Sequence, residues 1–368
     1  MQALAKKRVV VLGGYGEFSR RVAAGIAALP QVECVLGLPP PAADATRLAQ
    51  SIGVPFMMLD PNDPASLFRL LEGAFAVVNV RGPFTGRDHL TIPAHCAALG
   101  VHYIDPADTR EYVEDFTRLT REAREHDALL VTGAGTAPAV TSALTEWLIE
   151  GFERVDEIHI FVTPGMGDRR EIATARSIVG QVAAPLPVKE SGRWREEHSW
   201  TRPITIRFPS PIGRRRGYLC DLPDLELFAK RFDARTITAR AGFAPGALNM
   251  TLATLAAMRV RGWVKRLSPM PTLLVRLAAH LIYVGAKASA LRVAVTGVRD
   301  SVKEEHVAYL IARNDAGTAL SAAPILALVR RWVQEGVKQT GAVPCVGMLG
   351  FNDLKPEMAP YDIVLVRH

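Results

Sequence analysis

Short apolar runs alternate with amphipathic stretches through the first third of this chain. The apolar runs have the length and the Val, Ile and Leu content of buried strands. They lie at 8–12, 32–37, 55–60, 76–80, 101–105 and 128–132. The stretches between them, at 20–29, 43–52, 64–71, 91–99 and 111–127, have helical periodicity, and Asp63 is placed to cap the third of them. Strands separated by helices of this length must be joined by parallel crossovers, so the pattern predicts a doubly wound sheet.

The pattern changes after about residue 150. Residues 157–240 hold β-like runs punctuated by glycine, proline and arginine, residues 245–291 are apolar and helical, and 291–297 with 305–312 resemble a hairpin. A further helix at 322–334 is expected to pack back on the first part of the chain. The fold class predicted is α/β, with an N-terminal parallel sheet and a second α+β domain whose sheet is mainly antiparallel. The predicted domains are 1–150, completed by a C-terminal helix within about 320–368, and 151–320.

Composition supports a well-packed protein with two lobes. The chain has 368 residues, of which 49% are hydrophobic and 22% charged, and this length is more than one core usually holds. Its net charge of +7 suits an anionic ligand. Four scattered cysteines without a C-x-x-C pair indicate reduced thiols and a cytoplasmic location, and no histidine spacing indicates a metal site. No signal peptide is expected at the N-terminus.

The segment Gly13-Gly14-Tyr15-Gly16-Glu17-Phe18 joins the first strand to the first helix. Glycines in such a turn let the backbone approach a diphosphate, and the helix that follows directs its N–H groups and the positive end of its dipole at the phosphate charge. The third glycine of the usual dinucleotide fingerprint is replaced by Ser19, which is small enough for close helix packing. The turn therefore predicts a Rossmann domain that binds a dinucleotide, with an ordinary tight turn as the alternative.

Polar and turn residues follow the fourth, fifth and sixth predicted strands. Because ligands bind beyond the carboxyl ends of parallel strands, these three loops are expected to line one cleft. They are 79–86, 103–109 and 133–138.

Together these loops and the glycine turn resemble the NADP-binding domain of the saccharopine dehydrogenase-like family, over about the first 150 residues. The resemblance implies an oxidoreductase that transfers a hydride between NADP, or NAD, and a C=N, C=O or C=C bond. It implies cofactor contacts from the glycine turn, from Asp60, and from Asn79, Gly82, Pro83 and Phe84. Tyr103, Asp105 and Asp108 are expected at the substrate end as catalytic groups that donate or accept a proton.

Each of these side chains also has a structural interpretation. Asp60 and Asp105 precede prolines and could shape turns, Asp108 could cap the helix that follows it, and Tyr103 could belong to the core. Asn79 ends an apolar strand, where a polar side chain favours a functional role.

The chain departs from the family after the second strand. Residues 37–41 read Gly-Leu-Pro-Pro-Pro, with neither the acidic residue that binds the ribose of NAD nor the basic residue that binds the 2′-phosphate of NADP. Arg20, Arg21 or Arg47 are the candidates for that phosphate. The departure leaves open a second hypothesis, a catalytically silent nucleotide-binding or scaffold protein.

Three further features complete the predictions. The arginine-rich stretch 193–216 is interpreted as the solvated face of a sheet, with an anionic substrate or acidic partner as the alternative, and no nucleic-acid-binding fold is recognised. The Y-x-x-x-K match at 283–287 is attributed to chance.

The apolar residues 270–291 are interrupted by charges, so they indicate a buried helix that roofs a bulky or apolar small-molecule substrate, with a peripheral membrane contact as the alternative. A homodimer is expected.

Overall fold

The computed structural model describes residues 5–60, 63–82, 84, 90–165, 181–244, 246–263 and 288–368. The chain divides into two compact units, Met1–Val140 with Ser321–Glu357, and Thr141–Leu320 with Met358–His368. Three predictions fall largely or wholly outside the described residues. They are the cofactor contact from Pro83, most of the helix at 245–291 and the Y-x-x-x-K match at 283–287. No helix among the described residues has the length and hydropathy needed to cross a bilayer.

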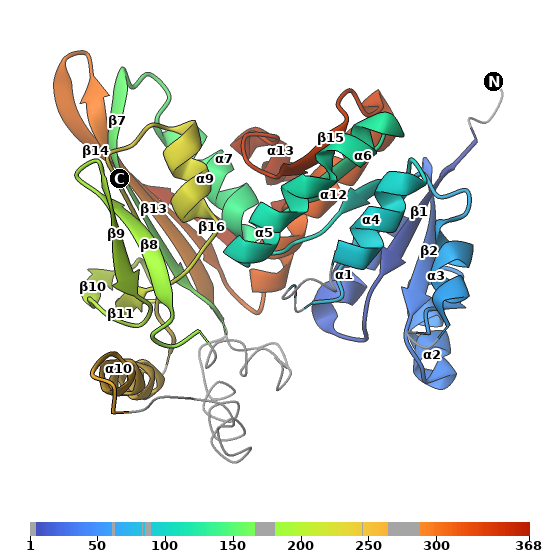
Figure 1. The fold of residues 1–368 in the computed structure, drawn as a ribbon, viewed down its shortest axis with the longest axis horizontal. Coiled ribbons are helices and arrows are strands. Elements are labelled where there is room, and N and C mark those ends of the chain that lie inside the picture. The colour runs from blue at the N-terminus through green and yellow to red at the C-terminus, as the bar shows by residue number, and fades with distance from the viewer. Residues whose placement is uncertain are drawn as a thin grey trace. The chain divides into compact units, whose positions relative to one another are not determined.

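The first unit is built on a seven-stranded sheet with the order β15-β6-β5-β4-β1-β2-β3. Every pair of neighbouring strands is parallel, and Figure 1 shows helices on both sides of the sheet. Its strands are β1 (Lys7–Leu12), β2 (Val32–Leu38), β3 (Phe56–Met58), β4 (Ala76–Asn79), β5 (His102–Ile104), β6 (Leu129–Thr132) and β15 (Gly341–Pro344). Its helical segments are α1 (Glu17–Ala27), α2 (Ala42–Ile52), α3 (Pro64–Leu71), α4 (Thr91–Ala98), α5 (Arg110–Phe116), η2 (Thr117–Leu119), α6 (Thr120–Glu125), η3 (Thr136–Val140) and α13 (Phe351–Met358). The doubly wound sheet predicted from the sequence is confirmed.

Local sequence explains where these elements begin and end. The apolar run in β1 is buried on both faces, as expected for a central parallel strand. Asp63 caps α3 by accepting a hydrogen bond from the N–H of Ala65 at 3.0 Å. Gly53 ends α2 in the left-handed conformation, with φ of 79°.

The long helix predicted at 111–127 is wrong in one respect, because it breaks into α5, η2 and α6. The hydroxyl of Thr117 donates to the carbonyl of Glu114 at 2.8 Å, and that of Thr120 donates to the carbonyls of Thr117 and Ala342. Threonine hydroxyls that bond to nearby carbonyls compete with regular helix geometry. The bond from Thr120 to Ala342 ties the break to β15, a strand that the sequence pattern did not reveal.

The second unit contains a mixed, mostly antiparallel sheet with the order β10-β11-β12-β7-β13-β14-β16, in which β8 also pairs with β12 and β9 pairs with β8. Its strands are β7 (Arg154–Thr163), β8 (Pro185–Glu190), β9 (Arg193–His198), β10 (Ile204–Arg207), β11 (Arg214–Leu219), β12 (Thr236–Ala241), β13 (Ser289–Arg299), β14 (Val302–Ala312) and β16 (Ile363–Arg367). Its helices are α7 (Thr141–Leu148), α9 (Asp224–Arg231) and α10 (Gly246–Val260), and α12 (Gly317–Glu335) begins in this unit and continues in the first. The predicted antiparallel character and the β13–β14 hairpin are confirmed, whereas β7 and β12 form a parallel pair.

Candidate functional site

The glycine turn after β1 leaves its backbone open to a ligand. Gly16 is the N-cap of α1, and no side chain caps that helix. Among the residues that the structure describes, none has an atom within 4 Å of a Cβ built on Gly14 or on Gly16. The uncapped N–H groups of the first turn of α1 therefore face a space where a diphosphate would find hydrogen-bond donors and the positive end of a helix dipole.

Gly13 has a different task in the same turn. A Cβ atom at this position would come within 3.1 Å of the Cβ of Ser19 and 3.4 Å of Val80. The hydroxyl of Ser19 accepts a hydrogen bond from the N–H of Gly14 at 3.2 Å. Ser19 therefore packs α1 closely against the turn, as the third glycine of the usual fingerprint would.

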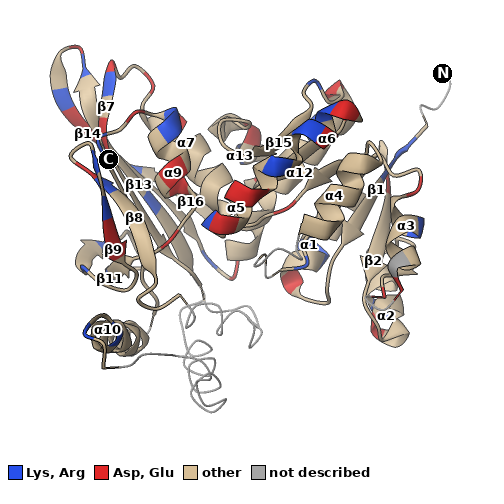
Figure 2. Ribbon diagram, in the orientation of Figure 1, with Lys and Arg blue, Asp and Glu red and all other residues tan. Residues whose placement is uncertain are grey.

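Charges around this turn favour an anion. The carboxylate of Glu17 in the first turn of α1 lies 3.0 Å from Arg21 and 3.9 Å from Arg20. Two arginines face one carboxylate, so the local balance is positive, and Figure 2 shows both signs of charge at the start of α1. Phe18 is partly buried beside them.

The segment after β2 is arranged without charged side chains, as the sequence indicates. The hydroxyl of Tyr15 donates to the carbonyl of Pro39, and 38% of the Tyr15 residue remains exposed. Arg47, on α2, pairs with Asp44 at 3.3 Å and is largely exposed. Tyr15 therefore ties the glycine turn to the segment that follows β2.

A chain of hydrogen bonds joins the carboxyl ends of β4 and β5 to α5. The side-chain amide of Asn79 donates to the hydroxyl of Tyr103 at 2.9 Å, Tyr103 bonds to Tyr112, and the hydroxyl of Tyr112 donates to Asp105 at 3.1 Å. Asn79 also accepts from the N–H of Arg81 at 3.2 Å. The amide nitrogen and the amide oxygen of Asn79, at the end of β4, thus both have hydrogen-bond partners.

Asp105 is fully buried at the centre of this network. Its Oδ1 accepts hydrogen bonds from Thr132 at 2.7 Å, from the N–H of Ala107 at 2.9 Å and from the N–H of Gly133 at 3.3 Å. Burial raises the pKa of Asp105 to about 6, and the donors oppose that shift without cancelling it. One carboxyl group therefore holds the loops after β5 and β6 in fixed positions.

The remaining predicted residues lie at different depths. Tyr103 is fully buried, and burial, followed by the charge of Asp105, raises its pKa well above the usual value. Phe84 is buried against Tyr112, with ring centroids 5.5 Å apart, whereas Gly82 and Asp108 are exposed. The N-cap of α5 is Thr109 and not Asp108.

Asp60 has a structural role at the end of β3, where its backbone N–H and carbonyl both bond to the hydroxyl of Ser66 at 3.1 Å. Sequence reasoning missed two members of the Asp105 network, Tyr112 and Thr132. A tyrosine near the start of a helix and a threonine at a strand end were the signals available.

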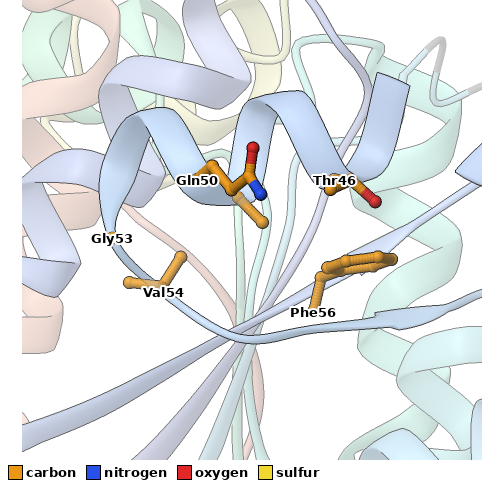
Figure 3. A pocket seen from close by; sticks show the side chains of 6 residues that line it. Thr46, Gln50, Gly53, Val54 and Phe56 are labelled. Atoms are coloured by element: carbon orange, nitrogen blue, oxygen red, sulfur yellow. The ribbon is translucent and has the colours of Figure 1, made fainter. Parts of the chain in front are cut away.

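A shallow depression of about 360 Å³ lies elsewhere on the first unit, between α2 and β3 (Figure 3). It is lined by Thr46, Ala49, Gln50, Gly53, Val54 and Phe56. Phe56 begins β3 and Gly53 ends α2, so the depression is at the amino end of this strand. Ligands of doubly wound sheets bind at the opposite, carboxyl end, and we do not assign this depression to the site.

Comparison with known proteins agrees with this geometry. Residues 9–135 match the family model of the saccharopine dehydrogenase NADP binding domain, a span that contains the glycine turn and the Asp105 network. No curated protein sequence matches the chain significantly.

Two solved structures show the same fold. Apo saccharopine dehydrogenase (L-Glu forming) from Saccharomyces cerevisiae is similar with a TM-score of 0.70 at 13% sequence identity, over 98% of this chain and 99% of that one. An engineered D-amino acid dehydrogenase bound to NADP+ is similar with a TM-score of 0.50 at 15% identity, over 97% of this chain and 100% of that one.

Proposed function

We propose that this chain is an NADP-dependent oxidoreductase of the saccharopine dehydrogenase-like family that acts on a small molecule. The observation that carries the proposal is the uncapped, open glycine turn at the start of α1, inside a domain that matches an NADP-binding family. When bound, NADP supplies or accepts the hydride. The protein's own part is to bind, orient and shield the reacting groups.

The residues of the first unit divide that work. Gly16 and the first turn of α1 hold the diphosphate through backbone N–H groups, and Gly14, whose own N–H bonds to Ser19, leaves room beside them. Gly82 and Phe84 follow β4 beside the nicotinamide ribose, and Asn79 fixes that loop by bonding to the N–H of Arg81. Pro83 and Asp60 remain predicted contacts.

We assign the proton chemistry to the loop after β5. Asp108 is exposed on that loop and is the group that can reach a substrate directly. Asp105 and Tyr103 are fully buried, so we propose that they act by positioning the loop. We also propose that Asp105 exchanges its proton with the site through the hydroxyl of Tyr112 or Thr132.

Arg47 is the side chain that we assign to the 2′-phosphate of NADP. It is the basic residue of α2, the helix that follows the uncharged segment after β2, and its ion pair with Asp44 is exposed and easily exchanged. Replacing Arg47 with alanine is expected to weaken NADP binding several-fold and to leave NAD binding unchanged. Arg121→Ala, which removes a similarly exposed arginine paired with Glu125 on α6, is the matched control.

The enzyme and the silent nucleotide-binding protein differ in turnover. Imines, ketones and activated alkenes with bulky apolar groups should be offered to the protein with NADPH, and consumption of the dinucleotide should be followed by its absorbance. The proposal predicts oxidation of NADPH with one of these classes and its loss in Asp108→Asn. Tight NADPH binding without turnover of any class would favour the silent protein. The predicted homodimer belongs to the same proposal and is tested by sedimentation of the purified chain.

A further inference from the structure

Three neighbouring strands of the second unit place polar side chains on one face of their sheet. His159 of β7 is in register with Thr238 of β12, and Phe161 of β7 is in register with Arg240 of β12 and Arg292 of β13. Alternate residues of a strand share a face, so these five side chains lie together. Figure 2 shows basic and acidic positions along the strands of this sheet.

Hydrogen bonds connect four of the polar groups in a row. An Nη1–H of Arg240 donates to the Oγ1 of Thr238 at 2.7 Å, and this hydroxyl lies 2.8 Å from the Nδ1 of His159. The Nε2 of His159 is 3.0 Å from a carboxylate oxygen of Glu157. Burial lowers the pKa of His159, with Glu157 opposing and Arg240 and Arg292 adding to the shift. A neutral imidazole fits the row, because its Nδ1 accepts from Thr238 while its Nε2–H donates to Glu157.

Burial and the charge of the nearby Arg202 lower the pKa of Arg240, the cation of this row. Only 8% of the residue is exposed, and its Nε has no hydrogen-bond partner. Among the residues that the structure describes, no carboxylate lies within ion-pair distance of Arg240. The nearby Arg202 pairs with Glu190 at 2.6 Å and with Glu197 at 2.9 Å, and Glu190 offsets the repulsion between Arg202 and Arg240 only in part. A guanidinium cannot lose its proton in a protein, so a buried one without a counter-ion is unfavourable unless a ligand supplies the charge.

The second cation of the face is also poorly neutralised. Arg292 has a side chain that is 13% exposed, and its carboxylate partner Glu305 is 3.7 Å away and more than half exposed. Its Nε lies 3.4 Å from the hydroxyl of Tyr309. Both arginines influence His159 electrostatically, so the two positive charges act on the same small region.

We propose that this face of the second unit binds the carboxylate of a small molecule, with Arg240 as its main contact and Arg292 as a second cation. The free edge of the Arg240 guanidinium offers Nε and Nη2 donors in the planar geometry that matches two carboxylate oxygens. A monoanion neutralises one buried charge, whereas a phosphate dianion would add negative charge beside Glu157. Every contact on which this site rests lies within the second unit.

The test is a calorimetric titration of the full chain with acetate, glutarate and inorganic phosphate at constant ionic strength, with chloride as the balancing anion. The variants are Arg240→Met, which removes the charge at similar length, and Arg240→Lys, which keeps the charge without the planar donors. Arg207→Met, at an exposed arginine of β10, is the matched control. We expect at least a tenfold weaker carboxylate affinity in R240M, an intermediate loss in R240K, and wild-type affinity in R207M.

Thermal stability separates a ligand site from a structural role. Because the guanidinium is buried without a counter-ion, R240M is expected to keep or raise the Tm of the ligand-free protein. Carboxylate binding to the wild-type protein should also raise the pKa of His159, measured by NMR, since the bound anion offsets the field of the arginines. Absence of saturable carboxylate binding, equal affinity in R240M, or tighter phosphate than carboxylate binding would each overturn the proposal. If R240M does not fold, the proposal stands or falls on R240K and on the His159 titration of the wild-type chain.

Discussion

Gly13 and Gly16 stand three residues apart in one turn, yet a side chain at each would have a different consequence. Gly13 faces Ser19 and Val80, so its missing Cβ lets α1 approach the sheet. Gly16 has no described atom close to the position of a Cβ, so the absence of that Cβ leaves room for a ligand. We therefore propose that the first glycine is needed for folding and the second for binding.

Replacing these two glycines with valine should separate the two roles. We expect G13V to lower the free energy of unfolding by about 1–3 kcal/mol, because the extra atoms overfill a tight contact. We expect G16V to change it by less than about 0.5 kcal/mol. Urea unfolding followed by circular dichroism measures both, and equal losses in the two variants would contradict the assignment.

Asp105 should give the protein a recognisable pH dependence. Its pKa of about 6 in the folded state lies above the usual 3.8, so the folded protein binds this proton more tightly than the unfolded chain. The contribution of this group therefore favours folding below about pH 4 and is lost as the pH rises through about 6, a change of about 3 kcal/mol.

Replacing Asp105 with asparagine removes this titration while keeping an acceptor oxygen for Thr132 and the two N–H donors. The stability of D105N relative to wild type should therefore increase between pH 4 and pH 7, by an amount on the order of 1–3 kcal/mol. Chemical unfolding at a series of pH values measures this difference. A difference independent of pH would show that Asp105 keeps its ordinary pKa.

At the scale of elements, the sequence predicted what local patterns control and missed what distant contacts decide. The strands, the cap at Asp63 and the stop at Gly53 follow from residues close in the chain. The strand β15 is short, contains Pro344 and pairs with β6 more than 200 positions earlier, so periodicity does not reveal it. The break between α5 and α6 is stabilised by the bond from Thr120 to β15 and was missed for the same reason.

The same division holds for the candidate site. A glycine turn after a strand can be read directly, because backbone access requires glycine at fixed spacing. The partners of Asp105 could not be read, since Tyr112 and Thr132 reach it only once β5, α5 and β6 are packed together. Burial of Tyr103 and Asp105 likewise depends on the assembled sheet.

The irregularity in β13 provides a test at this scale. The pairing of β13 with β7 shifts register between Thr296 and Gly297, and a Cβ atom on Gly297 would come within 2.2 Å of the carbonyl oxygen of Arg154. Backbone cannot move aside as a side chain does, so G297A is expected to lower the free energy of unfolding by about 2–3 kcal/mol. Gly246→Ala is the control, because a Cβ atom there meets nothing within 4 Å. Equal stability of G297A and G246A in urea unfolding would contradict the tight contact.

At the scale of the whole molecule, the two proposed binding sites differ in their chemistry. The first unit presents backbone N–H groups and a positive local balance to a dinucleotide. The second unit presents Arg240, a buried arginine for which the described residues offer no direct ion pair. If the proposals hold, the two sites can be removed one at a time: G16V should abolish NADP binding and spare carboxylate binding, and R240M should do the reverse.

The central claim is that the open turn before α1 holds the diphosphate of NADP, and a calorimetric titration of NADP into wild-type, G16V and G246V protein tests it most directly. Gly246 begins α10 in open space as Gly16 precedes α1, so G246V controls for a valine added at a helix start. The account predicts saturable binding to the wild-type and G246V proteins and at least a hundredfold weaker binding to folded G16V. Unchanged NADP affinity in G16V, or absence of binding to the wild-type protein at millimolar NADP, would contradict it.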